Sequence, residues 1–237
     1  GQLVKMTDAL GNTEKYSYDA AGNKTSETDK KGNETKYQYD AKNQLVKLTD
    51  ALGNATEYSY DHVGNVLKEI TPKGTTRYEY DAINQKIEEK NELKEKTLYD
   101  YDKNGNLTHV TDALGRVTVY SYDSLNQKTE QKAALGQTTK YQYDALGNVI
   151  RETDALGNSV ETRYDALGRV IQATDKNGNK TSTVYDDKNG TVTVTAADGG
   201  VTKTELDLLS RETEVTDALG HVTRKQYDGT GNLIRET

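Results

Sequence analysis

The sequence contains no cysteine, phenylalanine or tryptophan, and Pro72 is the only proline in 237 residues. Without cysteine the chain can form neither disulfides nor thiolate metal sites. No run of about 18 apolar residues occurs, so the sequence predicts no membrane span. The net charge of −7, without any stripe of Lys and Arg, provides no basic surface for nucleic acid.

The hydrophobic content is only 32% and the charged content 29%, values that on composition alone are compatible with disorder. The chain also has 17 tyrosines, and they recur with a strict period. That period favours a folded repeat protein. Gly1 falls in phase with Gly22, in the middle of a repeat, and the chain starts with neither Met nor a signal peptide. We therefore expect the chain to be an excerpt of a longer protein.

A Tyr-Asp step marks the repeat and supplies the residues that we predict to be structurally essential. The steps are Tyr18-Asp19, Tyr39-Asp40, Tyr60-Asp61, Tyr80-Asp81, Tyr101-Asp102, Tyr122-Asp123, Tyr143-Asp144, Tyr164-Asp165, Tyr185-Asp186 and Tyr227-Asp228, and Leu206-Asp207 fills the one gap. The spacing is 21 residues except for a single spacing of 20, between Asp61 and Asp81. No linker interrupts the register. Residues 1–237 are therefore predicted to form a single array of about eleven repeats.

Each repeat carries two turn signals, as in the Asp-Ala-Leu-Gly-Asn segments at residues 144–148 and 154–158. An Asp side chain can accept hydrogen bonds from backbone N–H groups two residues on, and Gly supplies the positive φ that closes a type I turn with a bulge. Strands of six or seven residues fit between such turns. The sequence thus predicts one β-hairpin per repeat, of about 10 and 11 residues in its two halves.

The strands alternate with a period of two residues, which excludes an amphipathic helix. The second strand reads Thr-x-Tyr-x-Tyr, as at residues 56–60 and 139–143, with polar residues between. In the first strand a β-branched or aliphatic residue, such as Val46 or Ile150, precedes a charged or polar one. We expect one sheet face of Tyr, Thr and Val or Ile and a second, charged face. Because no helix is encoded to cover the first face, the antiparallel sheet must curl into a spiral shell, tube or fibre.

Carboxylates are expected on the tyrosine side of this sheet. Glu27, Glu69, Glu89, Glu152 and Glu236 occupy the same repeat position as Met6, Leu48, Val110 and Val194. A charge in a dry core is costly, so this column favours a solvated interior with Tyr hydroxyls as polar groups.

No constellation for catalysis or cofactor binding stands out, and we predict neither enzyme activity nor a cofactor. His62, His109 and His221 occupy three unrelated repeat positions, and no phosphate loop or zinc spacing is present. The turn aspartates Asp8, Asp50, Asp112, Asp154 and Asp217 raise the alternative of Ca²⁺ binding, but their spacing matches neither an EF-hand loop nor the Gly-Gly-x-Gly-x-Asp nonapeptide. A structural turn explains them without metal.

Two further alternatives come from the turns and the tyrosines. Asn23, Asn33, Asn54, Asn106 and Asn179 begin glycosylation sequons, which are by-products of a turn Asn followed by a strand Thr. A ladder of tyrosines could stack sugar rings, so a carbohydrate-binding adhesin is one alternative. The competing explanation is that Tyr columns hold neighbouring strands together.

These residues resemble the RHS/YD-repeat family, whose pattern is close to Gly-x-x-x-x-Tyr-x-Tyr-Asp-x-x-Gly. The resemblance covers the whole chain, with ten Tyr-Asp steps in register. The family includes bacterial Rhs and wall-associated polymorphic toxins, B and C subunits of insecticidal toxin complexes, and animal teneurins. It implies a spiralling β-sheet that walls a hollow cocoon, which in the toxins encloses a C-terminal domain.

The chain departs from the toxins in lacking their self-cleaving core motif, because no Asp-Pro-x-Gly sequence exists here. We therefore expect a structural or interaction protein, a wall or fibre segment that is extracellular or at a bacterial cell surface. The first alternative is part of the encapsulating shell of an Rhs-type toxin, and the second is the adhesin. Expected partners are adjacent repeats or other copies of the protein, and in the alternatives an enclosed toxin domain or surface glycans.

Overall fold

A computed structural model describes residues 2–8 and 10–237. Within those ranges the regular structure consists of 23 β-strands and contains no helix, so no helix there could span a membrane. The strands are antiparallel to their neighbours and joined by short turns. The predicted all-β class and the hairpin repeat are confirmed.

The chain divides into two compact units, Gly1–Thr118 and Val119–Thr237. The strands of the first unit are β1 (Lys5–Thr7), β2 (Thr13–Tyr18), β3 (Lys24–Thr28), β4 (Glu34–Tyr39), β5 (Leu45–Thr49), β6 (Ala55–Tyr60), β7 (Val66–Thr71), β8 (Gly74–Tyr80), β9 (Lys86–Lys90), β10 (Lys96–Tyr101) and β11 (Leu107–Thr111). The unit boundary falls within β12 (Val117–Tyr122). The second unit continues with β13 (Lys128–Lys132), β14 (Thr138–Tyr143), β15 (Val149–Thr153), β16 (Ser159–Tyr164), β17 (Val170–Thr174), β18 (Lys180–Asp186), β19 (Thr191–Thr195), β20 (Val201–Leu206), β21 (Glu212–Thr216), β22 (Val222–Tyr227) and β23 (Leu233–Glu236).

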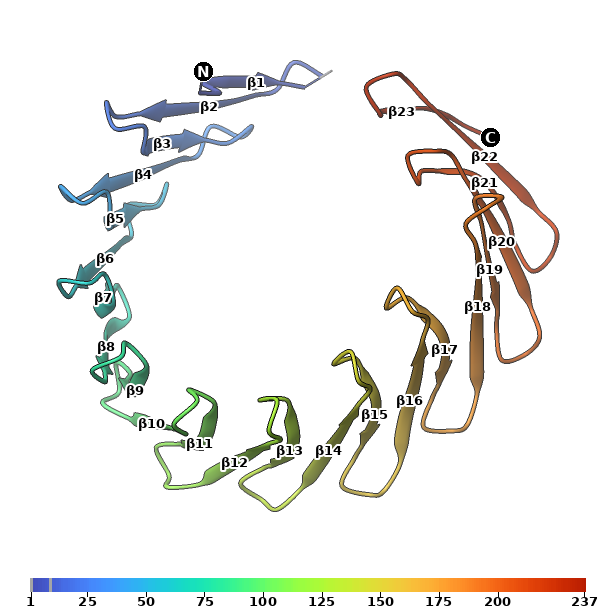
Figure 1. The fold of residues 1–237 in the computed structure, drawn as a ribbon. Coiled ribbons are helices and arrows are strands. Elements are labelled where there is room, and N and C mark those ends of the chain that lie inside the picture. Colours follow the sequence, from blue (N-terminus) through green and yellow to red (C-terminus); the bar gives the residue numbers. More distant parts are fainter. Residues whose placement is uncertain (1, 9) are drawn as a thin grey trace. The chain divides into compact units, whose positions relative to one another are not determined.

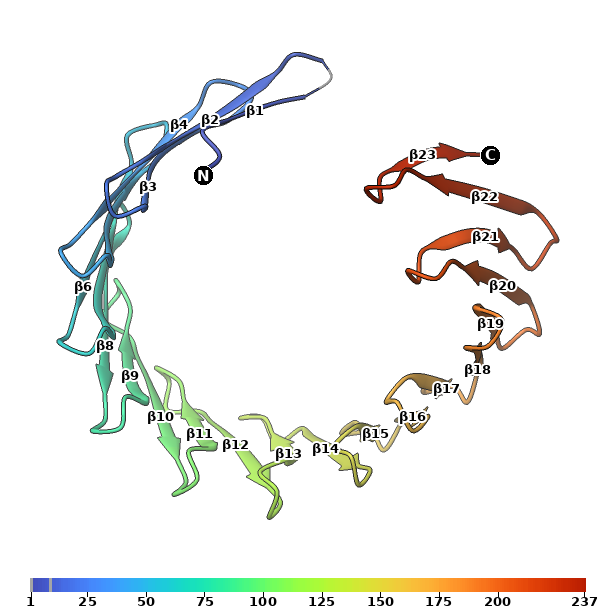
Figure 2. The same ribbon diagram turned by 45° about the horizontal axis from the view of Figure 1, so that its top comes forward.

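Within each unit the strands lie side by side in chain order and form a bent ribbon one sheet thick (Figures 1 and 2). We call the odd-numbered strands first strands and the even-numbered strands second strands. A first turn, which follows the Tyr-Asp step, joins a second strand to the next first strand. A second turn joins a first strand to the next second strand. First turns therefore lie along one edge of each ribbon and second turns along the other.

A β-bulge explains why the repeat has an odd number of residues. Between β6 and β7, Ser59 is opposite Lys68 and Tyr60 is opposite Val66, so Leu67 is an extra residue in β7. The β5–β6 pairing has no such shift. The bulge thus accounts for the longer half of the repeat. It also means that Val66 lies opposite Tyr60, whereas Leu67, at the repeat position of Val46 and Ile150 that was expected on the tyrosine face, is the bulged residue.

Both turn types use the same backbone hydrogen bonds. In the first turn the Gly147 N–H donates to the Asp144 carbonyl at 3.1 Å, and in the second turn Gly157 does the same to Asp154 at 3.0 Å. Both glycines have positive φ, 88° and 85°. The predicted turn with glycine in the left-handed region is confirmed. The Ala196 turn, irregular in sequence, keeps this geometry, since the Gly199 N–H donates to the Ala196 carbonyl at 3.0 Å.

The shorter spacing of 20 residues is located in the loop between β7 and β8. Thr71 pairs with Gly74, so Pro72 and Lys73 form a two-residue turn in place of the usual longer one. Pro72, the single proline of the sequence, thus lies in a second turn.

No residue in the described part of the chain is fully buried. In β6, Thr56, Tyr58 and Tyr60 are half-buried while Glu57 and Ser59 are exposed, so the predicted alternation is present in this second strand. The first strand β5 shows no alternation, because all of its residues are half-buried. The sheet therefore has no dry core in either unit. Its stability must come from pairing between neighbouring strands and from side-chain contacts along one face.

Candidate functional site

The tyrosine face is the half-buried side of the sheet that carries the Tyr-x-Tyr positions and the residues opposite them. The strand register places the predicted column of carboxylates on it, with Tyr16 opposite Glu27, Tyr58 opposite Glu69 and Tyr141 opposite Glu152. Leu48 takes the same position opposite Tyr37. Carboxylates and apolar side chains therefore share one column, as the sequence predicted.

The tyrosine of the Tyr-Asp step donates its hydroxyl hydrogen bond to a backbone carbonyl 14 or 15 residues earlier. The pairs are Tyr18 with Leu3, Tyr39 with Lys24, Tyr60 with Leu45, Tyr80 with Val66, Tyr101 with Lys86, Tyr143 with Lys128 and Tyr164 with Val149, at 2.7 to 3.1 Å. We call this contact the tyrosine staple.

The staple satisfies a backbone group at the place where the bulge disturbs the ladder. β3 and β4 pair from Ser26 opposite Lys36 to Thr28 opposite Glu34, and the Lys24 carbonyl lies beyond the last of these pairs. The Tyr39 hydroxyl reaches that carbonyl at 3.0 Å. A backbone carbonyl needs a hydrogen-bond donor where water is partly excluded. In each stapled hairpin, the tyrosine hydroxyl of the Tyr-Asp step is that donor.

The aspartate of the step organises the turn. In the Asp144 turn, one carboxylate oxygen accepts from the N–H groups of Leu146 and Asn148 at 2.9 Å, and the other accepts from the Asn148 side chain at 3.0 Å. These bonds favour the ionised form, and the pKa of Asp144 is lowered, chiefly by the Asn148 side chain. The second-turn Asp154 makes the same contacts, and Lys176 pairs with it at 2.8 Å. Both oxygens are therefore used within the turn.

First turns contact their neighbours along the edge in an alternating pattern that sequence reasoning missed. They end alternately in Gly-Asn (22–23, 64–65, 105–106, 147–148) and in Asn-Gln (43–44, 84–85, 126–127). The Asn23 side chain donates to the Asn43 side chain at 2.8 Å, and Asn65 donates to Asn84 at 2.9 Å. The Gln85 side chain donates to the Gly105 carbonyl at 3.4 Å.

Glycine opposite glutamine leaves room for a close approach of the glutamine amide, and its positive φ, 86° at Gly105 and 88° at Gly147, is the backbone reason for glycine there. A Cβ atom on Gly105 would lie 3.1 Å from the Gln85 side-chain nitrogen, and one on Gly147 would lie 3.0 Å from that of Gln127. Each kind of turn thus fits the other kind beside it. The sequence already contains the signal for these contacts: first turns alternate between Gly-Asn and Asn-Gln, so the pattern repeats every two repeats.

Lysines at three first-strand positions lie between tyrosine rings of successive repeats. Lys86 Nζ is 5.6 Å from the centre of the Tyr78 ring and 4.5 Å from that of Tyr99. It also pairs with Glu89 at 2.7 Å. Lys24 makes the equivalent contacts with Tyr16, Tyr37 and Glu27, and Lys128 with Tyr120, Tyr141 and Gln131. Cation–π contacts of this kind contribute about 0.5–1 kcal/mol each at exposed positions.

Glu69 has no lysine at the equivalent place, because Val66 occupies it. The Tyr78 hydroxyl lies 3.4 Å from Glu69, and partial burial together with the charges of Glu69 and Glu89 raises the pKa of Tyr78 to about 12. Tyr78 therefore stays protonated and serves as a hydrogen-bond donor on this face.

Arginine replaces the staple near the C-terminal end of the second unit. The Arg169 guanidinium lies 4.2 Å from the Tyr185 ring centre, and that of Arg211 lies 4.7 Å from the Tyr227 ring centre. Arg169 also pairs with both oxygens of Asp187, at 2.6 and 3.0 Å, and with Asp165 at 2.7 Å. In the described part of the chain, neither Tyr185 nor Tyr227 donates to a backbone carbonyl as the stapled tyrosines do.

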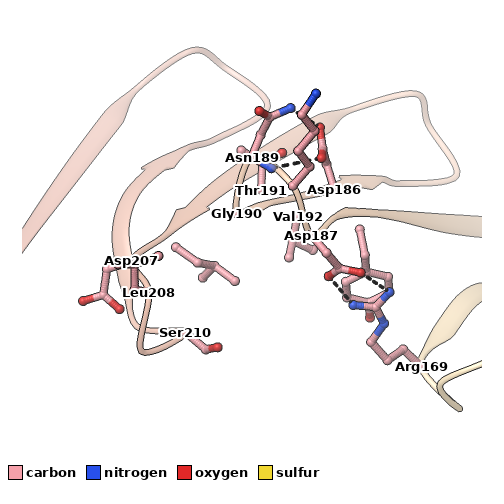
Figure 3. A pocket seen from close by; sticks show the side chains of 13 residues that line it. Arg169, Asp186, Asp187, Asn189, Gly190, Thr191, Val192, Asp207, Leu208 and Ser210 are labelled. Carbon is pink, nitrogen blue, oxygen red and sulfur yellow. Dashed lines mark hydrogen bonds and ion pairs between the residues drawn. The ribbon is translucent and has the colours of Figure 1, made fainter.

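A cavity of about 500 Å³ lies at this end, between the turn that follows Tyr185 and the turn that follows Leu206 (Figure 3). Its lining includes Arg169, Thr191, Val192, Leu206 and Leu208. It is located at the one repeat in which leucine replaces the tyrosine of the Tyr-Asp step.

The three histidines do not come together as a site. His109 contacts Thr108 at 3.1 Å, and His221 contacts the turn carboxylate of Asp217 at 2.9 Å. Among the described residues, no group of three His, Asp or Glu side chains is arranged to hold a metal ion.

Comparison with known proteins assigns the family. Residues 26–203 match the teneurin YD-shell family, and residues 1–35 and 207–237 match the RHS repeat. The chain belongs to the teneurin YD-shell family. The RHS/YD-repeat resemblance is thereby confirmed, and the YD-shell repeat is a structural one. No curated protein matches the chain.

Solved structures show the same fold. The YD-shell chain shares 15% identity with a chain in the crystal structure of TcdB2-TccC3-TEV, with a TM-score of 0.51, and 14% with one in TcdB2-TccC3, with a TM-score of 0.50. Each match covers 95% of this chain and 18% of the other. The chain thus spans less than a fifth of the length of the chains that it resembles.

Proposed function

We propose that the chain is a non-enzymatic segment of a secreted bacterial shell, in which residues 1–237 form one continuous array within a longer wall. The observation that carries this proposal is the single-layered sheet with two unlike faces and no buried core in the described residues. A wall needs firm contacts between neighbouring hairpins and two faces suited to different surroundings. Tyrosine staples, turn aspartates and contacts between first turns hold the neighbouring hairpins together.

The unlike faces favour enclosure. On the charged face, Lys47 pairs with Glu57 at 2.8 Å and Arg151 with Glu161 at 3.0 Å, so opposite charges alternate across strands in contact with water. The other face carries half-buried tyrosines. We infer that the tyrosine face looks inward and that the charged face looks outward.

The turn tips also favour a longer wall. Leu52 and Leu156 are each 88% exposed, and Leu114 is 75% exposed. Rows of exposed leucines along an edge are costly in water, and adjacent parts of a larger shell would cover them.

The first alternative, an encapsulating toxin shell, shares this wall and adds an enclosed toxin domain as the partner. The second, a carbohydrate-binding adhesin, has less support. Seven tyrosine hydroxyls are already bonded to backbone carbonyls, so they are not available to hydrogen-bond a sugar that stacks on the rings.

The absence of cysteine allows a direct test of enclosure. In the chain joined to its native flanking segments, Thr56→Cys places a thiol on the tyrosine face, and Ser59→Cys places one on the charged face of the same strand. We expect a small maleimide to label both and a large poly(ethylene glycol) maleimide to label only the Ser59 variant. Equal labelling of both by the large reagent in the folded protein contradicts the proposal, and labelling after denaturation is the control.

A further inference from the structure

The surroundings of Lys86 on the tyrosine face show what kind of group fits between two tyrosines of successive repeats. The Lys86 ammonium lies 5.6 Å from the ring centre of Tyr78 and 4.5 Å from that of Tyr99. It pairs with Glu89 at 2.7 Å, and the Tyr99 hydroxyl donates to the same carboxylate at 3.4 Å. The register places Glu89 opposite Tyr78. Two rings and a carboxylate thus surround a primary ammonium group. We call such a set of two rings and one carboxylate an ammonium frame.

The preceding repeat has the same frame without the lysine. Glu69 is opposite Tyr58, and the Tyr78 hydroxyl donates to the Glu69 carboxylate at 3.4 Å, as Tyr99 does to Glu89. Val66 stands at the position of Lys86, since each of them lies opposite the tyrosine of a Tyr-Asp step. A valine side chain ends at its γ carbons, so it neither extends between the rings as a lysine does nor supplies a charge.

Glu69 therefore lacks a counter-ion. Among the described residues, no lysine, arginine or histidine pairs with its carboxylate, and no cation lies over the Tyr58 ring. Glu69 and Val66 are both half-buried. The pKa of Tyr58 is raised by partial burial and by the charge of Glu69, so its hydroxyl stays protonated. A half-buried carboxylate without a counter-ion is unfavourable, and a cation bound from outside removes that cost.

The repeat that contains Glu152 shows which part of the frame matters. Val149 precedes Glu152 by three residues, just as Val66 precedes Glu69. In that repeat, however, Thr162 replaces the second tyrosine and Glu152 is exposed. In the part of the chain that the structure describes, the Glu69 frame alone combines two rings and a half-buried carboxylate with a missing lysine.

We propose that the frame of Tyr58, Tyr78 and Glu69 binds a primary alkylammonium group, the group that Lys86 supplies to its own frame. The ammonium lies between the two rings and donates to the Glu69 carboxylate, and its alkyl chain lies against Val66. A free amine and the lysine side chain of another protein share this chemistry. The inference does not depend on the proposed shell, because all of these side chains belong to the first unit.

The test uses the whole chain and n-butylammonium chloride, whose cation reproduces the side chain of lysine, at constant ionic strength. We expect saturable NMR shifts of the Tyr58 and Tyr78 ring signals. Binding of n-butanol, which lacks the charge, should be about tenfold weaker. Glu69→Gln should weaken ammonium binding about tenfold. Glu57→Gln removes the same charge from the other face, where Glu57 pairs with Lys47, and should leave binding unchanged. Absence of saturable shifts, equal binding of n-butanol, or equal effects of the two substitutions overturns the proposal.

Reciprocal substitutions at the lysine position give a second, independent measurement. Val66→Lys places a lysine in the Glu69 frame and should abolish binding there, and it keeps the backbone carbonyl that accepts the Tyr80 hydroxyl. Lys86→Val empties the other frame and should create a second site, reported by saturable shifts of the Tyr99 ring. Should Val66→Lys fail to fold, Lys86→Val still decides the matter. Unchanged binding in a folded Val66→Lys variant, or no new shift at Tyr99 in Lys86→Val, contradicts the proposal.

Nα-acetyl-lysinamide distinguishes the two sources of the ammonium group. Binding as strong as that of n-butylammonium supports a lysine side chain carried by a peptide, and binding of n-butylammonium alone supports a free amine. Both results support the alkylammonium class, and failure of both probes to bind overturns it.

Discussion

Two regions of the second unit hold their tyrosines in different ways. Tyr143 and Tyr164 donate to backbone carbonyls at 2.7 and 3.1 Å. Tyr185 and Tyr227 instead lie under Arg169 and Arg211, which come from the turn before each of them. A neutral hydrogen bond and an exposed cation–π contact contribute comparable free energies, about 1 kcal/mol each. The repeat therefore needs an anchored ring at this position and tolerates more than one way of anchoring it.

The residue that ends a first turn and the next tyrosine position change together. Arg169 precedes Tyr185 and Arg211 precedes Tyr227, whereas Gly190 precedes Leu206. Where the arginine is missing, the ring is missing too. We infer that the arginine and the ring form one contact unit in this region, and that its loss at Leu206 leaves the cavity.

Acid should produce the largest effect, because it acts on the turns of both regions, where the pKa values of Asp144, Asp165 and Asp207 are lowered, and on the other turns of the chain. The pKa of Asp8 is lowered to about 2, chiefly by Asn12, and that of Asp154 to about 2, chiefly by Lys176. Because these values lie below the ordinary value of 3.8, the ionised carboxylates stabilise the fold above pH 4, and this contribution is lost as the pH falls toward 2.

We therefore expect the β-sheet circular dichroism signal to be lost cooperatively between about pH 4 and pH 2. Asp154→Ala should make stability less dependent on pH over the same interval. A signal that stays unchanged down to pH 2 contradicts the role given to the turn carboxylates.

Tyr143→Leu would reproduce the Leu206 state inside the stapled region. The variant loses the hydroxyl bond to Lys128 and part of the ring contact, and we expect a loss of about 2 kcal/mol in unfolding free energy. Chemical denaturation measures the change. Leu146→Ala, at a turn tip that is 70% exposed, is the control and should change stability little. Similar losses of unfolding free energy in both variants would mean that the tyrosine ring contributes no more to stability than the exposed leucine at the turn tip.

Gly168 and Ser210 offer a reciprocal exchange between two turns that both end in arginine. Both have positive φ, 77° for Gly168 and 61° for Ser210, and a non-glycine residue there costs about 1–2 kcal/mol. Gly168→Ser should destabilise and Ser210→Gly should stabilise, each by about 1 kcal/mol. Thermal unfolding of the two variants and of the double variant is the measurement. Stability changes of the same sign in the two variants would contradict the claim that positive φ at Gly168 and Ser210 strains a non-glycine residue.

Removal of a single hydroxyl should give the smallest effect and the sharpest contrast. Tyr143→Phe loses the bond to the Lys128 carbonyl and should cost about 1 kcal/mol. Tyr185→Phe retains the ring under Arg169 and should cost close to nothing. Hydrogen exchange of the amides in each hairpin reports the local change. Equal effects would mean that the two regions anchor their tyrosines alike.

Much of the fold could be predicted from the sequence because the determinants are local. Asp144 and Gly147 dictate a turn within five residues, and Tyr141 and Tyr143 reveal a face by alternation alone. The same reasoning placed Glu152 on the tyrosine face, opposite Tyr141. Each of these inferences depends on neighbouring residues, and averaging over many repeats strengthens it.

The remaining features depend on register and on contacts between repeats. The bulge at Leu67 moves Val66 opposite Tyr60, a shift of one residue that alternation does not reveal. The staple from Tyr60 reaches the Leu45 carbonyl, which lies beside a separate bulge in β5, where Tyr39 pairs with Leu45 and Gln38 with Lys47. The cavity at Leu206 is lined by the loop at residues 187–190, whose width follows from the pairing of Tyr185 with Val192 without a bulge.

The alternation of first turns limits how such a gene can lengthen or shorten. Asn65 faces Asn84, and Gln85 faces Gly105, so each turn is matched to the opposite kind on its next neighbour. Duplication or deletion of one 21-residue repeat would bring two turns of the same kind together. Duplication or deletion of two repeats, twice 21 or 42 residues, restores every match. The heritable module in this part of the chain is thus a pair of hairpins, although the module visible in the Tyr-Asp spacing is one.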